Sequence, residues 1–199
     1  MSAPSRTRTL LDTLGAALNL REGEAPLVLL MLAHSFLNGI PKTLDNSAGT
    51  ALFLEQHGAR VVMTRTTNDP VELALRPIIA RRENANAFVS VHLNAYGDGV
   101  NPFVARNGSG TYFFHRLSEP LARPVQRGLV RQMGLPNLGV YYDNLAVVRG
   151  TWMPMVLTEG AFVIIPEQEA AIRTPEFQAR YAQGIVDGLE EYFRWLGKQ

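Results

Sequence analysis

The sequence contains no cysteine among its 199 residues. This absence excludes a disulfide framework and a thiolate metal site, so any bound metal would need histidine and carboxylate ligands. It neither requires nor excludes an oxidising compartment. Charge of one sign is also scarce, because the formal net charge is only +1. No broad electrostatic attraction to nucleic acid or to an anionic membrane is therefore expected.

A long hydrophobic run is missing as well. The apolar segment at residues 25–40, APLVLLMLAHSFLNGI, is shorter than the roughly 20 residues of a membrane-spanning helix. Glu22 and Glu24 precede it, and no small-residue cleavage site follows it, which argues against a signal peptide. We expect a buried strand or helix here. Its leucine and methionine content suits a helix at least as well as a strand.

Apolar strand-like segments alternate with helix-like segments along the rest of the chain. This alternation predicts one layered α/β domain with a largely parallel sheet, and any domain boundary would lie before residue 58. We expect strands at residues 58–65, 88–93, 110–115, 145–150 and 154–162, and helices at residues 46–57, 69–87, 118–134 and 174–196.

Two of these helices carry distinct end signals. Asp69 and Pro70 are typical of a helix start, and Pro77 is expected to kink or interrupt that helix. Thr174 is the expected N-cap of the last helix. Its apolar residues recur every three or four positions and predict one buried face, formed by Phe177, Tyr181, Ile185, Leu189, Tyr192 and Leu196.

Two polar residues follow apolar strand segments. His92 comes near the end of FVSVHLNA (88–95), and Glu159 follows Met155–Leu157, with Gly160 expected to let the backbone turn away. Ligands bind at the carboxyl ends of strands in open α/β sheets, although a structural role for His92 is an alternative. A buried carboxylate needs a partner. Glu159 is therefore either a general base or metal partner, or an ion-pair partner of a residue such as Arg149.

Five short motifs occur in an order that resembles one known family. VVMTR, SVHLNA, GTYFF, VVR and VLTEGAF resemble the zinc-dependent N-acetylmuramoyl-L-alanine amidases with the "amidase 3" type of catalytic domain, from about Gly58 to Leu196. The resemblance implies a mixed sheet with helices on both faces. It also implies hydrolysis of the amide between N-acetylmuramic acid and L-alanine in peptidoglycan, in the cell envelope (periplasmic or extracellular). Residues 58–199 would form the amidase-like domain, after an atypical segment at 1–57.

The resemblance assigns His92 as a zinc ligand and Glu159 as the catalytic glutamate. The first zinc histidine of the family has only His34 as a candidate here, and the Gly-rich turn of the family is absent around it. The family's ligating glutamate would fall near Asn38, where Asp45 is the nearest carboxylate. A catalytic zinc needs three protein ligands. We therefore expect a weak or inactive amidase with incomplete zinc occupancy, or alternatively a non-catalytic peptidoglycan-binding relative.

Other polar residues are weaker candidates. Asn94, Arg76 and Arg149 would orient ligands or substrate, or else form buried hydrogen bonds and ion pairs. His115 ends a strand near the expected substrate side or is a surface residue, and His57 ends a helix and is expected to be structural. The loop YYDN (141–144) offers Tyr142 or Asp143 to substrate. Residues 18–57 also resemble the first membrane helix of some transport proteins, which leaves membrane association as a further alternative.

Overall fold

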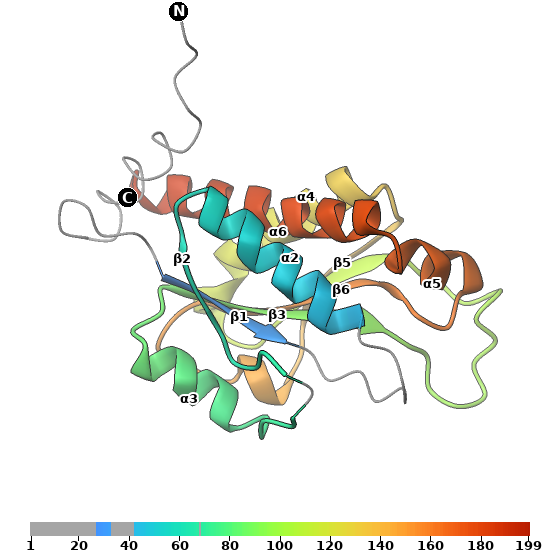
Figure 1. The fold of residues 1–199 in the computed structure, drawn as a ribbon, viewed down its shortest axis with the longest axis horizontal. Helices are drawn as coiled ribbons and strands as arrows, with labels where there is room; N and C mark the ends of the chain where they lie inside the picture. Colours follow the sequence, from blue (N-terminus) through green and yellow to red (C-terminus); the bar gives the residue numbers. More distant parts are fainter. Residues whose placement is uncertain (1–26, 33–41, 68) are drawn as a thin grey trace, which may run out of the picture.

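The structure, a computed structural model, describes residues 27–32, 42–67 and 69–199. Its helices cover both faces of a central sheet, with α2, α4 and α6 on one face and α3 on the other (Figure 1). The strands are β1 Leu27–Leu32, β2 Arg60–Met63, β3 Ala87–Asn94, β4 Ser109–Phe113, β5 Asn137–Tyr142 and β6 Met155–Phe162. The helices are α2 Lys42–Gln56, α3 Leu75–Arg82, α4 Glu119–Met133, α5 Pro166–Ile172 and α6 Pro175–Leu196, with short 3-10 turns η1 Arg116–Ser118 and η2 Ala146–Val148.

The described strands form one sheet in the order β2-β1-β3-β6-β4-β5. Neighbours are parallel except β4 and β6, which are antiparallel. The mixed, largely parallel α/β fold is therefore confirmed. β3 and β6 lie side by side and run in the same direction, so their carboxyl ends meet at one edge of the sheet.

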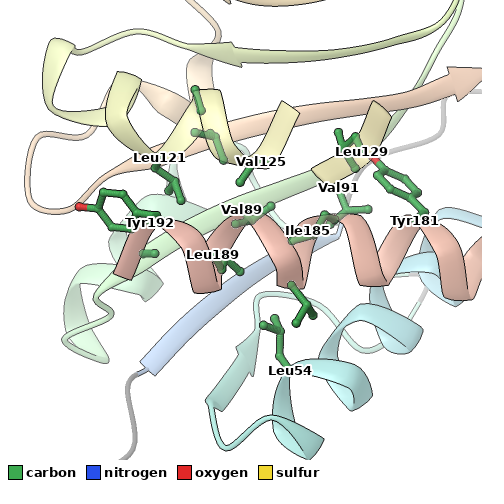
Figure 2. Close-up of a cluster of buried hydrophobic side chains, with 14 of the residues drawn as sticks. Leu54, Val89, Val91, Leu121, Val125, Leu129, Tyr181, Ile185, Leu189 and Tyr192 are labelled. Carbon is green, nitrogen blue, oxygen red and sulfur yellow. The ribbon is translucent and has the colours of Figure 1, made fainter. Parts of the chain in front are cut away.

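The larger hydrophobic cluster lies between the sheet and the helices α2, α4 and α6 (Figure 2). The predicted apolar face of α6 is confirmed, since Tyr181, Ile185 and Leu189 are buried against Val89 and Val91 of β3. The predicted cap is also confirmed, because the Thr174 side chain accepts a hydrogen bond from the Phe177 amide. Glycines let α4 and α6 approach closely. A Cβ atom at Gly188 would lie 2.3 Å from the Cα atom of Val125.

The helix predicted from residue 69 begins later, at Leu75. Asp69 does not cap it, because its carboxylate accepts a hydrogen bond from the Thr67 hydroxyl at 2.8 Å. Pro77 is the third residue of α3 and lies in its first turn. Amide groups in a first turn have no intrahelical acceptor, so the missing proline N–H costs nothing there. The predicted kink at Pro77 is therefore wrong.

One strand prediction and one loop prediction are also wrong. Residues 145–150 contain the 3-10 turn η2 instead of a strand. Val147 and Val148 are buried there in a second, smaller hydrophobic cluster on the α3 side of the sheet. The segment YYDN (141–144) is predicted to be a loop, but its first two residues, Tyr141 and Tyr142, belong to the strand β5. Burial in an irregular segment explains the first error, because short apolar runs are not specific to strands.

Residues 27–32 form a strand, although their composition suits a helix. β1 pairs in parallel with β2 on one side and with β3 on the other. Backbone pairing on both edges outweighs the weak helical propensity of leucine and methionine. The helix α2, which also precedes residue 58, lies beside α6 in the same layer (Figure 1). The proposed boundary between residues 57 and 58 stays a prediction.

None of the described helices has both the length and the hydropathy that a membrane crossing requires.

Candidate active site

His92 and Glu159 occupy paired positions on neighbouring strands. They are register partners in the parallel β3–β6 ladder, and adjacent strands lie about 4.8 Å apart. Alternate residues of a strand point to the same face. Phe88 on β3 and Leu157 on β6 belong to the smaller cluster on the α3 side. His92 and Glu159 therefore lie together on that side, near the carboxyl ends of both strands.

The Glu159 carboxyl is held in an environment that disfavours its charge. Burial raises the pKa of Glu159 to about 8. Its Oε2 atom is buried without a hydrogen-bond partner among the residues that the structure describes. The alternative ion pair with Arg149 is wrong, because the Arg149 guanidinium donates to Asn144 Oδ1 at 2.7 Å and to the Asn144 carbonyl. A buried carboxyl with a pKa near neutrality is suited to proton transfer.

Gly160 does not turn the chain away after Glu159, because β6 continues to Phe162. The glycine is needed for a different reason. A Cβ atom at this position would lie 2.5 Å from the ring of Tyr181. Tyr181 reaches from α6 to the sheet, and its hydroxyl donates to the His92 carbonyl at 2.8 Å. The same hydroxyl lies 2.8 Å from the Thr158 hydroxyl, so one side chain ties β3 to β6 behind the paired residues.

Tyr112 on β4 extends this group. Burial, followed by the negative charge of Glu159, raises the pKa of Tyr112, while a hydrogen bond with the Asn94 side chain lowers it. The predicted residue Asn94 therefore hydrogen bonds to Tyr112, which is near enough to Glu159 to respond to its charge. Tyr112 itself was missed. Its alternation with Phe114 in GTYFF is a strand signal, but the antiparallel pairing that puts β4 beside Glu159 is not visible in that signal.

Glycines occupy the positions paired with Glu159 on the outer strands of the sheet. Gly110 on β4 is the register partner of Glu159, and Gly139 on β5 is the partner of Gly110. A Cβ atom at Gly110 would have the rings of Tyr141 and Tyr112 at 3.6 and 3.7 Å. These two rings stack with their centroids 5.1 Å apart. Gly110, Gly139, Tyr112 and Tyr141 therefore lie on the side of Glu159 that faces β4 and β5.

The weaker candidates occupy different environments. Arg76 is fully buried and donates from Nε to the Val71 carbonyl at 3.0 Å, and burial followed by the charge of Arg65 lowers its pKa. The His57 ring hydrogen bonds to the Phe53 carbonyl at 2.7 Å, in line with the expected structural role.

Three further candidates lie around the end of β4. His115 Nε2 donates to the Arg149 carbonyl at 2.7 Å, because a carbonyl oxygen can only accept. Asp143 accepts from the Asn144 amide at 2.7 Å, and its own amide donates to the Phe113 carbonyl. Tyr142 is two-thirds exposed and stacks on Phe114. A substrate role for any of these residues stays a prediction.

The described part of the chain contains no group of three metal-ligating side chains. His34 lies outside the described residues, and Asp45 lies in α2 with its side chain outside the description. His92 and Glu159 nevertheless suit a zinc-bound water, since an imidazole and a buried carboxyl are the usual ligand and base of such centres. The described residues thus supply one candidate zinc ligand, His92, and the candidate base, Glu159.

Comparison with known proteins agrees with this arrangement. The family model for N-acetylmuramoyl-L-alanine amidase matches residues 43–191. The probable cell wall amidase LytH of Staphylococcus epidermidis is 32% identical over 151 residues, which cover 76% of this chain and 48% of that relative. A LytH of Staphylococcus aureus matches over the same shares of both chains. The chain thus spans about half the length of the curated relatives it matches.

Solved structures show the same fold. The catalytic domain of CwlV, an N-acetylmuramoyl-L-alanine amidase from Bacillus (Paenibacillus) polymyxa var. colistinus, superposes with a TM-score of 0.76 at 30% identity, over 84% of this chain and 98% of that one. The amidase AmiC2 of Nostoc punctiforme gives a TM-score of 0.74 at 29% identity, over 84% and 96% of the two chains. The chain belongs to the N-acetylmuramoyl-L-alanine amidase family.

Proposed function

We propose that this protein hydrolyses the amide between the lactyl group of N-acetylmuramic acid and L-alanine in peptidoglycan, with zinc as its cofactor. The observation that carries the proposal is the register pair of His92 and Glu159 at the carboxyl ends of β3 and β6. Membership of the amidase family supports the bond cleaved. The name of the staphylococcal relatives, cell wall amidase, supports action in the cell envelope, either periplasmic or extracellular.

Glu159 is the general base in this proposal. Its carboxylate takes a proton from water while the water oxygen attacks the amide carbonyl carbon. The protonated Glu159 then gives that proton to the amide nitrogen as the carbon–nitrogen bond breaks. The products are a peptide with a free L-alanine amine and a lactyl carboxylic acid, which keeps the second proton of the water and then loses it to solvent, so atoms and protons balance. A carboxyl whose pKa lies near neutrality can serve in both steps.

His92 would hold the zinc through an imidazole nitrogen, with His34 and Asp45 as proposed further ligands. When bound, zinc lowers the pKa of its water to about 7 and polarises the carbonyl. Tyr181 fixes the backbone of His92 from behind, which limits the movement of its ring. Asn94 and Tyr112 hydrogen bond to each other, Tyr112 senses the charge of Glu159, and both are proposed to orient the substrate amide.

A non-catalytic peptidoglycan-binding protein is the second candidate. The observation that favours it is the ligand set, because among the described residues only His92 is assigned to zinc and no glutamate lies near Asn38 in the sequence. A site with one or two protein ligands would hold zinc weakly. The amidase proposal therefore includes low zinc occupancy and low activity that rises when zinc is added.

Zinc content and hydrolysis, measured together, separate the two candidates. The purified protein is dialysed against a mild chelator and assayed on peptidoglycan with and without added zinc, beside His92→Ala and His57→Ala. An amidase releases free L-alanine amines in proportion to bound zinc, and His92→Ala loses both signals while His57→Ala keeps them. Binding to peptidoglycan without hydrolysis at saturating zinc would support the non-catalytic candidate. Zinc stoichiometry in His92→Ala equal to that of the parent would remove His92 from the ligand set.

A further inference from the structure

We propose that the loop between β3 and β4 inserts an apolar tip, formed by Val100, Phe103 and Val104, into the surface of a lipid bilayer. Bilayer contact is a function separate from the proposed hydrolysis and does not depend on it. The loop comprises residues 95–108 and extends past the edge of the sheet at which β3 and β6 end, where Figure 1 shows it in light green. The apolar tip therefore belongs to a segment that stands out from the body of the protein.

The apolar tip carries the most exposed large apolar side chains that the structure describes. Phe103 is 76% exposed and Val104 is 81% exposed, and Val100 is also exposed. A single exposed apolar side chain on a protein surface is ordinary and needs no explanation. Here three of them occur within five positions of one projecting loop. Their exposure to water is unfavourable by the free energy that burial of each side chain would recover.

The backbone amides around Phe103 and Val104 are satisfied within the loop itself. The Phe103 amide donates to Asn101 Oδ1 at 3.0 Å. The Val104 and Ala105 amides donate to the Asn101 carbonyl at 3.4 and 3.1 Å, and Pro102 has no amide hydrogen. A segment that enters lipid must satisfy its backbone donors internally, because the bilayer core offers no water. This turn meets that requirement for its amides before it leaves water.

The base of the loop is fixed on the protein. The Tyr96 ring stacks on Phe162 of β6, with the ring centroids 4.6 Å apart. Its hydroxyl donates to the Arg106 carbonyl at 2.9 Å and so joins the two arms of the loop. On the second arm, the Gln168 side chain of α5 donates to Asn107 Oδ1 at 2.8 Å. A loop held in this way loses little conformational entropy when its tip binds.

Area and charge favour a bilayer over a protein as the partner. The three side chains of the apolar tip offer about 300–400 Å², whereas each partner in a stable protein complex buries about 800 Å². Their neighbours Gly97, Asp98 and Gly99 add no large apolar side chain. A bilayer accepts a small apolar tip without a complementary surface, while Asp98 and Arg106 stay among the headgroups. Because these two charges are opposite, the insertion should not require anionic lipid.

The experiment measures sedimentation of the full chain with lipid vesicles. One vesicle preparation is pure phosphatidylcholine, and the other is an equal mixture of phosphatidylcholine and phosphatidylglycerol. The double variant Phe103→Ser/Val104→Ser removes the two most exposed side chains of the apolar tip. The control Leu52→Ser/Trp195→Ser removes two exposed apolar side chains from the helices α2 and α6. Circular dichroism and thermal melting establish that each variant is folded.

We expect the parent to bind both vesicle preparations with partition coefficients within about threefold of each other. Phe103→Ser/Val104→Ser should lower the partition coefficient by about tenfold or more, since burial of one such side chain already contributes a factor of that size. The control should stay within about twofold of the parent. A third variant, Phe103→Trp, reports the depth of the tip. Its additional emission should shift to the blue with vesicles and be quenched by lipids that are brominated in their acyl chains.

Each of four results would overturn this proposal. The first is a parent protein that binds neither vesicle preparation. The second is equal binding by folded Phe103→Ser/Val104→Ser, which would assign the lipid contact to another part of the chain. The third is binding to anionic vesicles alone that is lost at high salt, which would indicate basic side chains instead of the apolar tip. The fourth is self-association of the parent that the double variant loses, without vesicle binding, which would make the tip a contact between protein copies.

Discussion

Tyr181 of α6 donates a hydrogen bond from its hydroxyl to the main-chain carbonyl of His92 on β3, over 2.8 Å. The bond passes from the helix layer to the strand that carries the proposed zinc ligand. Because Tyr181 is fully buried and also contacts the Thr158 hydroxyl, it couples helix packing to the position of the site.

Removing this hydroxyl tests the coupling. Tyr181→Phe leaves the partly buried His92 carbonyl without this partner, and we expect it to lower the free energy of unfolding by about 1–2 kcal/mol. It should also weaken zinc binding, since the backbone behind His92 is less constrained. Tyr192→Phe is the matched control, because it removes the hydroxyl of another largely buried tyrosine of the same helix without breaking any hydrogen bond found between described residues. Urea unfolding and zinc titration measure both effects. Equal stability and equal zinc affinity in Tyr181→Phe and the parent would contradict the coupling.

The buried carboxyl of Glu159 makes the stability of the metal-free protein depend on pH. Burial raises its pKa from the ordinary value of 4.5 to about 8 in the folded state. Between these values the folded state binds more protons than the unfolded state, so the free energy of unfolding falls as pH rises from 4.5 to 8 and is then level. Glu159→Gln cannot ionise and should lose this decline.

We therefore expect Glu159→Gln to gain stability relative to the parent as pH increases, by more than about 1 kcal/mol between pH 5 and pH 9. Urea midpoints in the presence of a chelator measure the difference at pH 5, 7 and 9. Glu176→Gln serves as the control, because its carboxylate is 73% exposed and its ion pair with Arg180 lies at the surface. A difference between Glu159→Gln and the parent that stays constant across this range would show that the carboxyl is not buried as described.

The contact between α4 and α6 depends on glycine. Gly188→Ala would put a Cβ atom 2.3 Å from the Val125 Cα atom, where backbone and not a flexible side chain must move. We expect a loss of about 2–3 kcal/mol in unfolding free energy, as in other overpacked cores. Gly49→Ala is the opposite case. It lies within α2 with no atom within 4 Å of the new Cβ, so it should stabilise the protein by about 0.5–1 kcal/mol. Thermal unfolding of both variants checks the pair, and a Gly188→Ala protein as stable as Gly49→Ala would contradict the described packing.

The elements that the sequence predicts well are those with a complete pattern of their own. α6 combines an N-cap, a proline in its first turn and an apolar residue at every turn, so its first and last residues can be predicted from the local sequence. The positions of His92 and Glu159 near strand ends also follow from short apolar runs that each end in a polar residue. That the two residues are register partners does not follow, because the pairing of β3 with β6 is decided by the whole sheet.

The errors have a common physical origin, which is tertiary packing. β1 is a strand because it is paired on both sides, whereas its leucines and methionine allow a helix. β5 escapes detection because Gly139 interrupts its apolar pattern, and with it the stacking of Tyr141 on Tyr112 was missed. The antiparallel placement of β4 beside β6 has no local signal, although it brings Gly110 to Glu159. The residues beside the proposed catalytic group therefore come from the least predictable part of the sheet.

The most direct test of the account is the rate at which free L-alanine amines appear from muramoyl-peptide, compared between the parent and Glu159→Gln at equal zinc occupancy. The account predicts that Glu159→Gln folds and binds zinc as the parent does, while its rate falls by roughly 10² to 10⁴, the usual effect of losing an acid–base group. A Glu159→Gln protein that keeps the parental rate at equal zinc occupancy would contradict the assignment of Glu159 as the general base.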